Sequence, residues 1–159
     1  MDELDLAFAA SRPEFQDELK AIEHLERVVW GGVPTCPHCG CTNRVSRVAP
    51  NPRKRIRMGL WSCGPCRRQF TVKIGTVFEH ARLPLHKVLQ ATYLITGWNK
   101  GINAHRLHLV LGVSYKTANV LVRRIRAAAR ELDHDQARCW DERLRQVAKS
   151  RKAPVSADR

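Results

Sequence analysis

The sequence has no segment that could cross a membrane or direct export. No run of about 18 apolar residues is present, and a membrane-spanning helix needs at least that length. The first ten residues, MDELDLAFAA, carry acids where a secretory signal carries Lys or Arg. We therefore expect a cytoplasmic protein that has no membrane partner.

Acidic residues are almost absent from the middle of the chain. Residues 31–130 hold one acid, Glu79, and 18 Lys or Arg, whereas residues 1–30 hold eight acids and three bases. The net charge of the 159 residues is +13. Solubility does not require acids to be excluded from a hundred residues, so the pattern predicts binding to nucleic acid and association with the nucleoid. Only ten aromatic residues are present, without a base-stacking motif, which favours double-stranded DNA over RNA.

Four of the six cysteines have the spacing of a metal site. Cys36-Pro-His-Cys39 is followed by Cys63-Gly-Pro-Cys66. A tight turn lets both thiolates of one CxxC pair reach the same ion, and two such pairs complete a tetrahedral shell. Gly40 and Gly64 are expected to supply the unusual backbone angles of these turns. The sequence therefore predicts one Zn²⁺ ion, which is structural because a four-thiolate shell leaves no position for water.

Other uses of these cysteines are less favoured. In a redox site a long helix would follow the CxxC pair, whereas short strands follow both pairs here. His38 or Cys41 can replace one of the four ligands, but His38 lies inside the first loop, where its ring points outward. Cys139 stands alone on a C-terminal helix and is expected to pack as a small apolar residue.

The first thirty residues predict an amphipathic helix. Ser11 and Glu14 have the spacing of a capping box, with Pro13 in the first turn. Apolar residues then recur at helical spacing until Trp30-Gly31-Gly32, which ends the helix. The acids of this helix lie on its other faces, and we expect them to be solvated.

The rest of the chain predicts a small sheet followed by helices. Three β-like runs, Arg44 to Val48, Arg55 to Trp61 and Gln69 to Ile74, indicate a three-stranded antiparallel zinc ribbon. Helical patterns follow Pro84. The expected fold class is α+β. We divide it into an N-terminal acidic helix (1–31), a zinc ribbon (32–80), a helix-turn-helix domain (81–135), and a C-terminal helix with a disordered tail (136–159).

Residues 103–130 have the pattern of a helix-turn-helix. Asn103 and Ser114 are expected to cap two helices that are joined by a turn at Gly112. If the apolar side chains of the second helix face inward, a polar set faces outward and can contact bases and phosphates in the major groove. That set is Tyr115, Lys116, Thr117, Asn119, Arg123, Arg124 and Arg126. The alternative is an ordinary helical hairpin with a solvated basic face.

A second basic stretch lies in the expected ribbon. Arg53, Lys54 and Arg55 form part of a hairpin connection between the first two strands. They would widen the footprint by contacting DNA phosphates, and the alternative is a solvated loop.

From about Trp30 to Arg130 the chain resembles the N-terminal region of bacterial insertion-sequence transposases that begin with a zinc ribbon. The residues that carry the resemblance are CPHCG, WSCGPCRRQFTVKIGTVFE, ARLPL and LGVSYKTANVLVRRIRAA. The stretch with the second CxxC pair, an aromatic strand and a Gly-Thr-x-Phe turn is the most specific. The resemblance implies that these modules bind the terminal repeats of the element and that a separate DDE-type catalytic domain follows.

The chain departs from that family after Arg130. DDE catalysis uses three separated carboxylates on a ribonuclease-H-like domain to hold two divalent metals. Only 29 residues follow Arg130, and four of their acids, Asp133, Asp135, Asp141 and Glu142, lie in one short stretch. We therefore expect no catalytic residues and no enzymatic activity from this chain alone.

The sequence thus predicts sequence-directed binding of double-stranded DNA by a truncated or retained transposase-like protein. One alternative is a DNA-binding subunit or fragment of a transposase that works with a catalytic partner. Another is a protein-interaction adaptor of the transcription machinery, in which the acidic helix pairs with a partner. The sequence is compatible with a homodimer and with a complex between this chain and a transposase partner.

Overall fold

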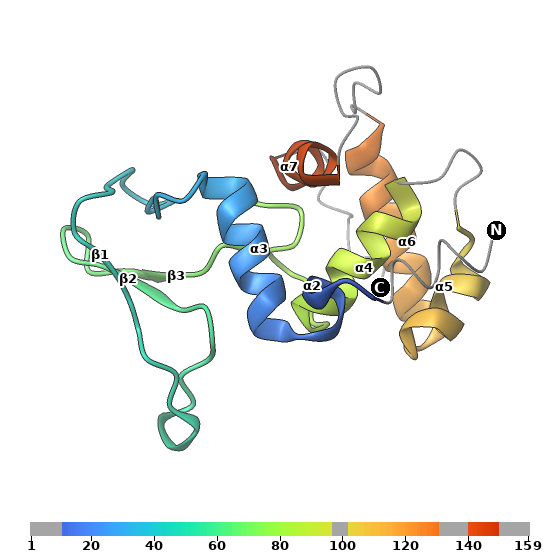
Figure 1. The fold of residues 1–159 in the computed structure, drawn as a ribbon, viewed down its shortest axis with the longest axis horizontal. Helices are drawn as coiled ribbons and strands as arrows, with labels where there is room; N and C mark the ends of the chain where they lie inside the picture. The colour runs from blue at the N-terminus through green and yellow to red at the C-terminus, as the bar shows by residue number, and fades with distance from the viewer. Residues whose placement is uncertain (1–10, 97–101, 131–139, 150–159) are drawn as a thin grey trace.

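A computed structural model describes residues 11–96, 102–130 and 140–149 (Figure 1). A small sheet lies at one end of the molecule and the helices lie at the other, with α3 between them. In chain order the elements are α2 (Pro13–Gln16), α3 (Glu18–Trp30), β1 (Val45–Arg47), the 3₁₀ turn η1 (Pro52–Lys54), β2 (Trp61–Cys63), β3 (Gln69–Phe70), α4 (Leu85–Thr96), α5 (Ala104–Leu111), α6 (Tyr115–Ala129) and α7 (Trp140–Lys149). The α+β fold class is confirmed.

The N-terminal segment forms two helices where the sequence predicts one. Asp17 adopts an extended conformation (φ −118°, ψ 131°) between α2 and α3, and its carboxylate accepts a hydrogen bond from the Lys20 backbone N–H at 2.9 Å. The predicted capping box of Ser11 and Glu14 is wrong, because Arg12 occupies the N-cap position of α2 and its side chain makes no capping hydrogen bond. The predicted end of the helix is confirmed, since Gly31 has φ 63°.

The sheet has the predicted three antiparallel strands, in the order β1-β2-β3. Val45 pairs with Cys63, and Trp61 pairs with Phe70. The second strand begins six residues later than expected, because η1 ends with Arg55 in a left-handed conformation (φ 54°) that interrupts an extended chain. The third strand ends at Phe70, after which a turn closes with a hydrogen bond from Ile74 N to Thr71 O at 3.1 Å.

Two apolar cores form within the described residues. The larger core joins the helices and includes Phe15, Leu25, Leu89, Ile125 and Leu144. The smaller core lies in the ribbon around Cys36, Cys63 and Phe70. The Trp30 ring at the end of α3 packs against both cores and meets the rings of Trp61 and Phe70 edge-on, at centroid distances of 5.7 and 5.9 Å. One helix therefore contributes to both cores.

Two acids of α3 are structural, which corrects the expectation that the acids of this helix are solvated. The Glu18 carboxylate accepts from the backbone N–H groups of Leu85 and His86, at 2.8 and 3.1 Å, at the start of α4. Glu26 is buried and accepts from the Trp61 indole Nε1 at 2.7 Å and from the Arg47 guanidinium. Their partners lie on other elements, so the helical pattern alone did not indicate them.

Gly59 sets the distance between α3 and the chain that leads into β2. It is buried with φ +73°, and a Cβ atom there would lie 2.9 Å from Ile22 Cγ2. A residue with a Cβ atom at this position would therefore strain the backbone and require Ile22 or the chain around position 59 to shift. Within the described ranges, no helix combines the length and apolar character needed to cross a bilayer.

Candidate metal centre and nucleic-acid interface

The four predicted ligand thiols lie together at the end of the sheet. The Sγ atoms of Cys36 and Cys66 are 3.7 Å apart, those of Cys39 and Cys63 are 3.5 Å apart, and all four lie within 4.8 Å of one another. A tetrahedral zinc ion with Zn–S bonds of about 2.3 Å requires sulfur–sulfur separations of about 3.8 Å. The four cysteines therefore fit one structural zinc ion.

The two CxxC turns are built in the same way. Cys36 N donates to Cys41 O, and Cys63 N donates to Arg68 O, both at 3.0 Å. Gly40 and Arg67, each four residues after the first cysteine of its turn, have φ of 72° and 55°. Gly64 has an ordinary φ, which corrects the expectation of an unusual angle there. Its role is a close approach, because a Cβ atom at this position would lie 3.4 Å from Arg44 O.

The thiols differ in how readily they ionise without a metal. Burial opposes ionisation of Cys36, but the backbone groups of His38 and Cys39 hydrogen-bond its sulfur and lower its pKa to about 7. The backbone of Cys66 favours ionisation of Cys63, but burial and the neighbouring thiols outweigh it and raise the pKa of Cys63 to about 12. A cation is therefore needed to hold all four as thiolates at neutral pH.

The alternative ligands stand apart from this cluster. Within the described part of the chain, the cysteine cluster contains neither His38, which is exposed, nor Cys41, which packs against the ribbon core. Cys139 and its predicted packing lie outside the described residues.

Residues 103–129 form two helices joined by a tight turn, as the sequence predicts. The Asn103 side chain accepts from Arg106 N at 2.8 Å to begin α5, and Gly112 ends that helix with φ 60°. Ser114 Oγ accepts from Thr117 N at 3.2 Å to begin α6. These side-chain caps satisfy N–H groups that have no partner within their own helices.

One face of α6 is buried and the opposite face is exposed. Ala118, Leu121, Val122 and Ile125 lie in the helical core. The side chains of Lys116, Asn119 and Arg123 are exposed, and Tyr115 at the start of the helix is 55% exposed. Thr117 and Arg124 are half-buried at the margins of this face. The structure thus brings most of the predicted DNA-binding residues of α6 to one surface.

Arg126 is engaged within the protein although its residue is exposed. Its Nη2 atom donates to Ile102 O, 2.9 Å away, at the start of the α5 region. Lys87 of α4 donates to Leu111 O at 2.9 Å, close to the turn between α5 and α6. Two cations from the acid-poor residues 31–130 therefore make contacts that stabilise the helix-turn-helix.

Val120 is a member of the exposed α6 face that the sequence analysis missed. It is 48% exposed and lies one helical turn after Lys116 and nearly one turn before Arg123. The core-facing stripe passes through Ala118 and Leu121 on the other side of the helix. Where a helix enters the major groove, an apolar side chain can contact the methyl group of thymine.

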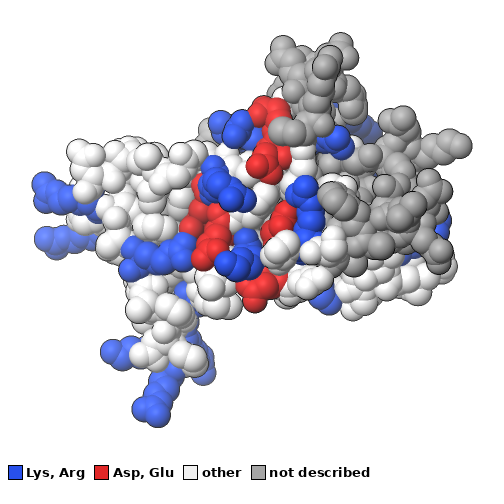
Figure 2. All heavy atoms as spheres, viewed as in Figure 1, with Lys and Arg blue, Asp and Glu red and all other residues white. Residues whose placement is uncertain are grey.

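The predicted basic stretch of the ribbon lies at the tip of an arm. Arg53, Lys54 and Arg55 are all exposed, and the arm is closed by backbone hydrogen bonds between Asn51 and Ile56. Figure 2 shows Lys and Arg at this tip and at the far end of the ribbon, whereas Asp and Glu gather over the middle of the molecule, near α3. Positive charge therefore extends well beyond α6.

Comparison with known proteins places the ribbon in a family. Residues 16–69 match the family described as the transposase zinc-ribbon domain. The chain is 32% identical over 119 residues to an uncharacterized protein in transposable element ISH50 of Halobacterium salinarum. That alignment covers 75% of the chain but 37% of the Halobacterium protein, so the chain spans little more than a third of its relative. No solved structure matches the chain significantly. The resemblance to the N-terminal region of insertion-sequence transposases is confirmed.

Proposed function

We propose that this chain binds double-stranded DNA in a sequence-directed manner, as a transposase-like protein. The observation that carries the proposal is the exposed face of α6, where Lys116, Asn119 and Arg123 lie together on a helix that Ser114 caps. A transposase-related role in nucleic-acid binding is supported by the match of residues 16–69 to the transposase zinc-ribbon domain.

Charge favours a polyanion as the partner of this face. Residues 80–130 contain no Asp or Glu, so no acid on α5 or α6 opposes the approach of phosphates. The same region carries Arg106 on α5 and four cations on α6. An ordinary solvated helix would be expected to mix both signs of charge.

The proposed mechanism divides the contacts by chemistry. Lys116 and Arg123 can donate to guanine O6 and N7, and the Asn119 amide can pair with adenine. Tyr115 and Thr117 lie at the N-terminus of α6, where the helix dipole favours a phosphate. The arm residues Arg53, Lys54 and Arg55 would contact the phosphate backbone at a second place and carry no sequence information.

The zinc ion stabilises the ribbon in this scheme and takes no chemical step. A sheet with strands of two or three residues buries too little apolar surface to fold alone, so metal binding supplies part of its folding energy. We accordingly propose that the described residues contribute recognition and take no part in the chemistry of strand transfer. Metal-dependent cleavage of duplex DNA by the purified zinc-loaded chain would contradict that part of the proposal.

The test of DNA binding is selection of bound duplexes from a random pool, followed by titration of the selected duplex. We expect a defined recognition sequence, and an affinity that falls by orders of magnitude between about 50 and 200 mM salt because counterions are released. Asn119→Ala should weaken binding by about 1–3 kcal/mol and relax the preference at one base pair. An enriched pool without a common sequence, or binding that is insensitive to salt, would contradict the proposal.

A further inference from the structure

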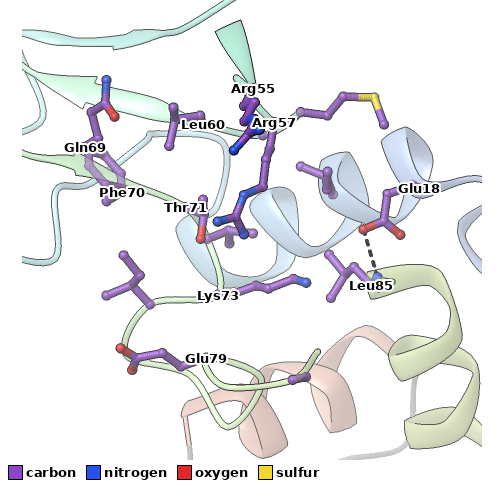
Figure 3. Close-up of a pocket in the computed structure, with 16 residues that line it drawn as sticks. Glu18, Arg55, Arg57, Leu60, Gln69, Phe70, Thr71, Lys73, Glu79 and Leu85 are labelled. Carbon is purple, nitrogen blue, oxygen red and sulfur yellow. Dashed lines mark hydrogen bonds between the residues drawn. The ribbon is translucent and has the colours of Figure 1, made fainter. Parts of the chain in front are cut away.

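A cavity of about 560 Å³ lies where the ribbon meets α3 and α4. Its wall is formed by α3, the chain between η1 and β2, β3 and the turn that follows β3 (Figure 3). The volume falls within the range of about 300 to 1,000 Å³ that is typical of small-molecule sites. The sequence analysis gave no indication of this cavity, because it is assembled from segments far apart in the chain.

Three cations line the cavity without a partner. Arg57 and Lys73 extend into it from two different segments of the chain, and Arg55 lies beside Arg57 (Figure 3). Among the described residues, no hydrogen bond or ion pair engages the side chains of these three residues. Lys73 is half-buried, and burial lowers the pKa of its ammonium group. The charge of Glu18 opposes this shift, and that of Arg57 reinforces it. A partly buried cation that forms no ion pair is uncommon in proteins.

The two carboxylates in the cavity wall are already engaged. Glu18 accepts from the backbone N–H groups of Leu85 and His86, and from His86 Nδ1 at 2.9 Å. Glu79 accepts from the backbone N–H of Gly75 at 3.1 Å. Both acids therefore have fixed positions, and neither forms an ion pair with Arg55, Arg57 or Lys73.

Apolar side chains also line the cavity. Ile22 and Leu60 line the cavity, and Met58 at its edge is 46% exposed. Methionine is flexible and adapts its shape to a flat ligand. An anion with an apolar or aromatic portion therefore matches this wall better than a bare inorganic ion.

We propose that this cavity binds a nucleotide, with its phosphate held by Arg55, Arg57 and Lys73 and its base against Ile22, Leu60 and Met58. Both a free nucleotide and an unpaired nucleotide at the end of a DNA strand have this chemistry. The site is separate from the α6 face, so it does not depend on base reading in the major groove. It would make the junction between ribbon and helices a second nucleic-acid site.

The test uses the full zinc-loaded chain and two kinds of probe. Calorimetric titration with deoxyadenosine 5′-monophosphate, compared with inorganic phosphate, examines the free nucleotide. A duplex with a 5′-phosphorylated single-stranded overhang, compared with the blunt duplex of the same sequence, examines a DNA end. We expect at least one of the two pairs to show a base-dependent gain, with the nucleotide or the overhang bound about tenfold more tightly than its comparator.

Variants locate the binding. Arg57→Gln and Lys73→Gln should each weaken nucleotide or overhang binding by about tenfold or more, since each removes a charge-assisted hydrogen bond. Arg44→Gln is the matched control, because it removes the same charge from an exposed residue of the ribbon that lies outside the cavity wall. It should leave nucleotide or overhang binding within about twofold.

The proposal is overturned if neither the nucleotide nor the overhang binds more tightly than its comparator. It is also overturned if Arg44→Gln weakens binding as much as Arg57→Gln, because the effect would then be general electrostatic attraction. Binding of the blunt duplex measures the contact of α6 with DNA, and it does not depend on the cavity. Loss of blunt-duplex binding through Asn119→Ala, together with unchanged binding of the free nucleotide, would separate the two sites.

Discussion

The carboxylate of Glu26 on α3 accepts a hydrogen bond of 2.7 Å from the indole Nε1 of Trp61 on β2, 35 residues away. The second oxygen of the same carboxylate accepts from Arg47 on β1, whose guanidinium lies 5.2 Å above the Trp61 ring. One buried acid thus joins α3 to two strands of the ribbon. This contact and the Trp30 ring together fix the ribbon against the helices.

The first prediction follows from the two donors that depend on Glu26. Glu26→Leu leaves the Trp61 indole N–H and the Arg47 guanidinium without their acceptor, and should lower the free energy of unfolding by about 1–3 kcal/mol in urea titrations. Glu26→Gln keeps one carbonyl acceptor and should cost less. Glu23→Gln on the same helix is the control, because its exposed pair with Lys20 should change stability by less than about 0.5 kcal/mol. Equal stability of Glu26→Leu and this control would contradict the prediction.

The second prediction concerns removal of zinc. We expect one zinc ion per chain by elemental analysis, lost in Cys63→Ser and retained in Cys41→Ser, because Cys41 is outside the cluster of four sulfurs. Chelation should change the fluorescence of Trp61 and Trp30 as the ribbon opens. Far-UV ellipticity at helical wavelengths should change little, because the larger core contains none of the four ligand cysteines. Complete loss of helical signal on chelation would show that the two cores fold only together.

A third prediction separates two arginines on the same helix. Arg123 is exposed, and the described residues give its side chain no partner, so Arg123→Gln should leave stability within about 0.5 kcal/mol and weaken DNA binding. Arg126 donates to Ile102 O, so Arg126→Gln should lower the free energy of unfolding by about 1 kcal/mol. Urea titration and DNA titration of both variants check the contrast. The reverse order of stability effects would be incompatible with the Ile102 contact.

The fourth prediction assigns a base contact to Val120. In a duplex that the chain selects, replacing each thymine in turn by deoxyuridine removes only the C5 methyl group. One such replacement should weaken binding by about 1 kcal/mol if Val120 packs against that methyl group. The same replacement should have no effect on Val120→Ala, whereas Val120→Ile retains the sensitivity. If no position is sensitive in the unsubstituted chain, Val120 does not read thymine.

His24 provides a prediction of pH dependence. Its ring is buried and stacks on Trp140 at a centroid distance of 6.4 Å. Arg27 Nη2 lies 2.8 Å from Nδ1, so Nδ1 accepts a hydrogen bond and the neutral ring carries its proton on Nε2, which lies 3.2 Å from Asp141 Oδ1. Burial lowers the pKa of His24 below 6.5. The charges of Glu14 and Asp141 oppose this shift, and that of Arg27 reinforces it.

The sign of the effect on stability follows from proton binding. Below about pH 6.5 the unfolded chain protonates His24 while the folded chain does not, so the unfolded state gains protons and stability falls. The stabilisation is fully present above pH 6.5 and is lost as the pH falls toward the folded-state pKa. Unfolding titrations at about pH 7.5 and 5.5 should show a larger loss for the unsubstituted chain than for His24→Gln. The exposed His80→Gln should behave as the unsubstituted chain does.

The sequence predicts the local features well because their causes lie within a few residues. Gly31 and Gly112 end helices, and Asn103 and Ser114 begin them, each through a contact within five residues. The metal centre is also predictable, because CxxC spacing fixes two ligands in each turn. The predicted capping box is wrong because a second cap lies only a few residues later. The Asp17 side chain accepts the capping hydrogen bond from Lys20 N.

Most of the features that the sequence does not reveal are long-range. Glu18 and Glu26 are typical solvent-facing acids in the helical pattern, and their partners are identified only when α4 and the sheet are in place. The predicted start of the second strand is wrong because Arg55 adopts a left-handed conformation, which an alternating pattern cannot indicate. The cavity with Arg57 and Lys73 has no sequence signal, since its wall is drawn from four separate segments.

The contact between Gly59 and Ile22 bears on how this zinc module could be exchanged between proteins. The family match begins at residue 16, so it includes α3 as well as the cysteines. A fragment that began after Gly32 would lose Ile22, Glu26 and Trp30, and would expose Trp61 and the side of Phe70 that Trp30 covers. The unit that can be inherited or transplanted intact is therefore the helix together with the ribbon, because the helix supplies one wall of the ribbon's small core.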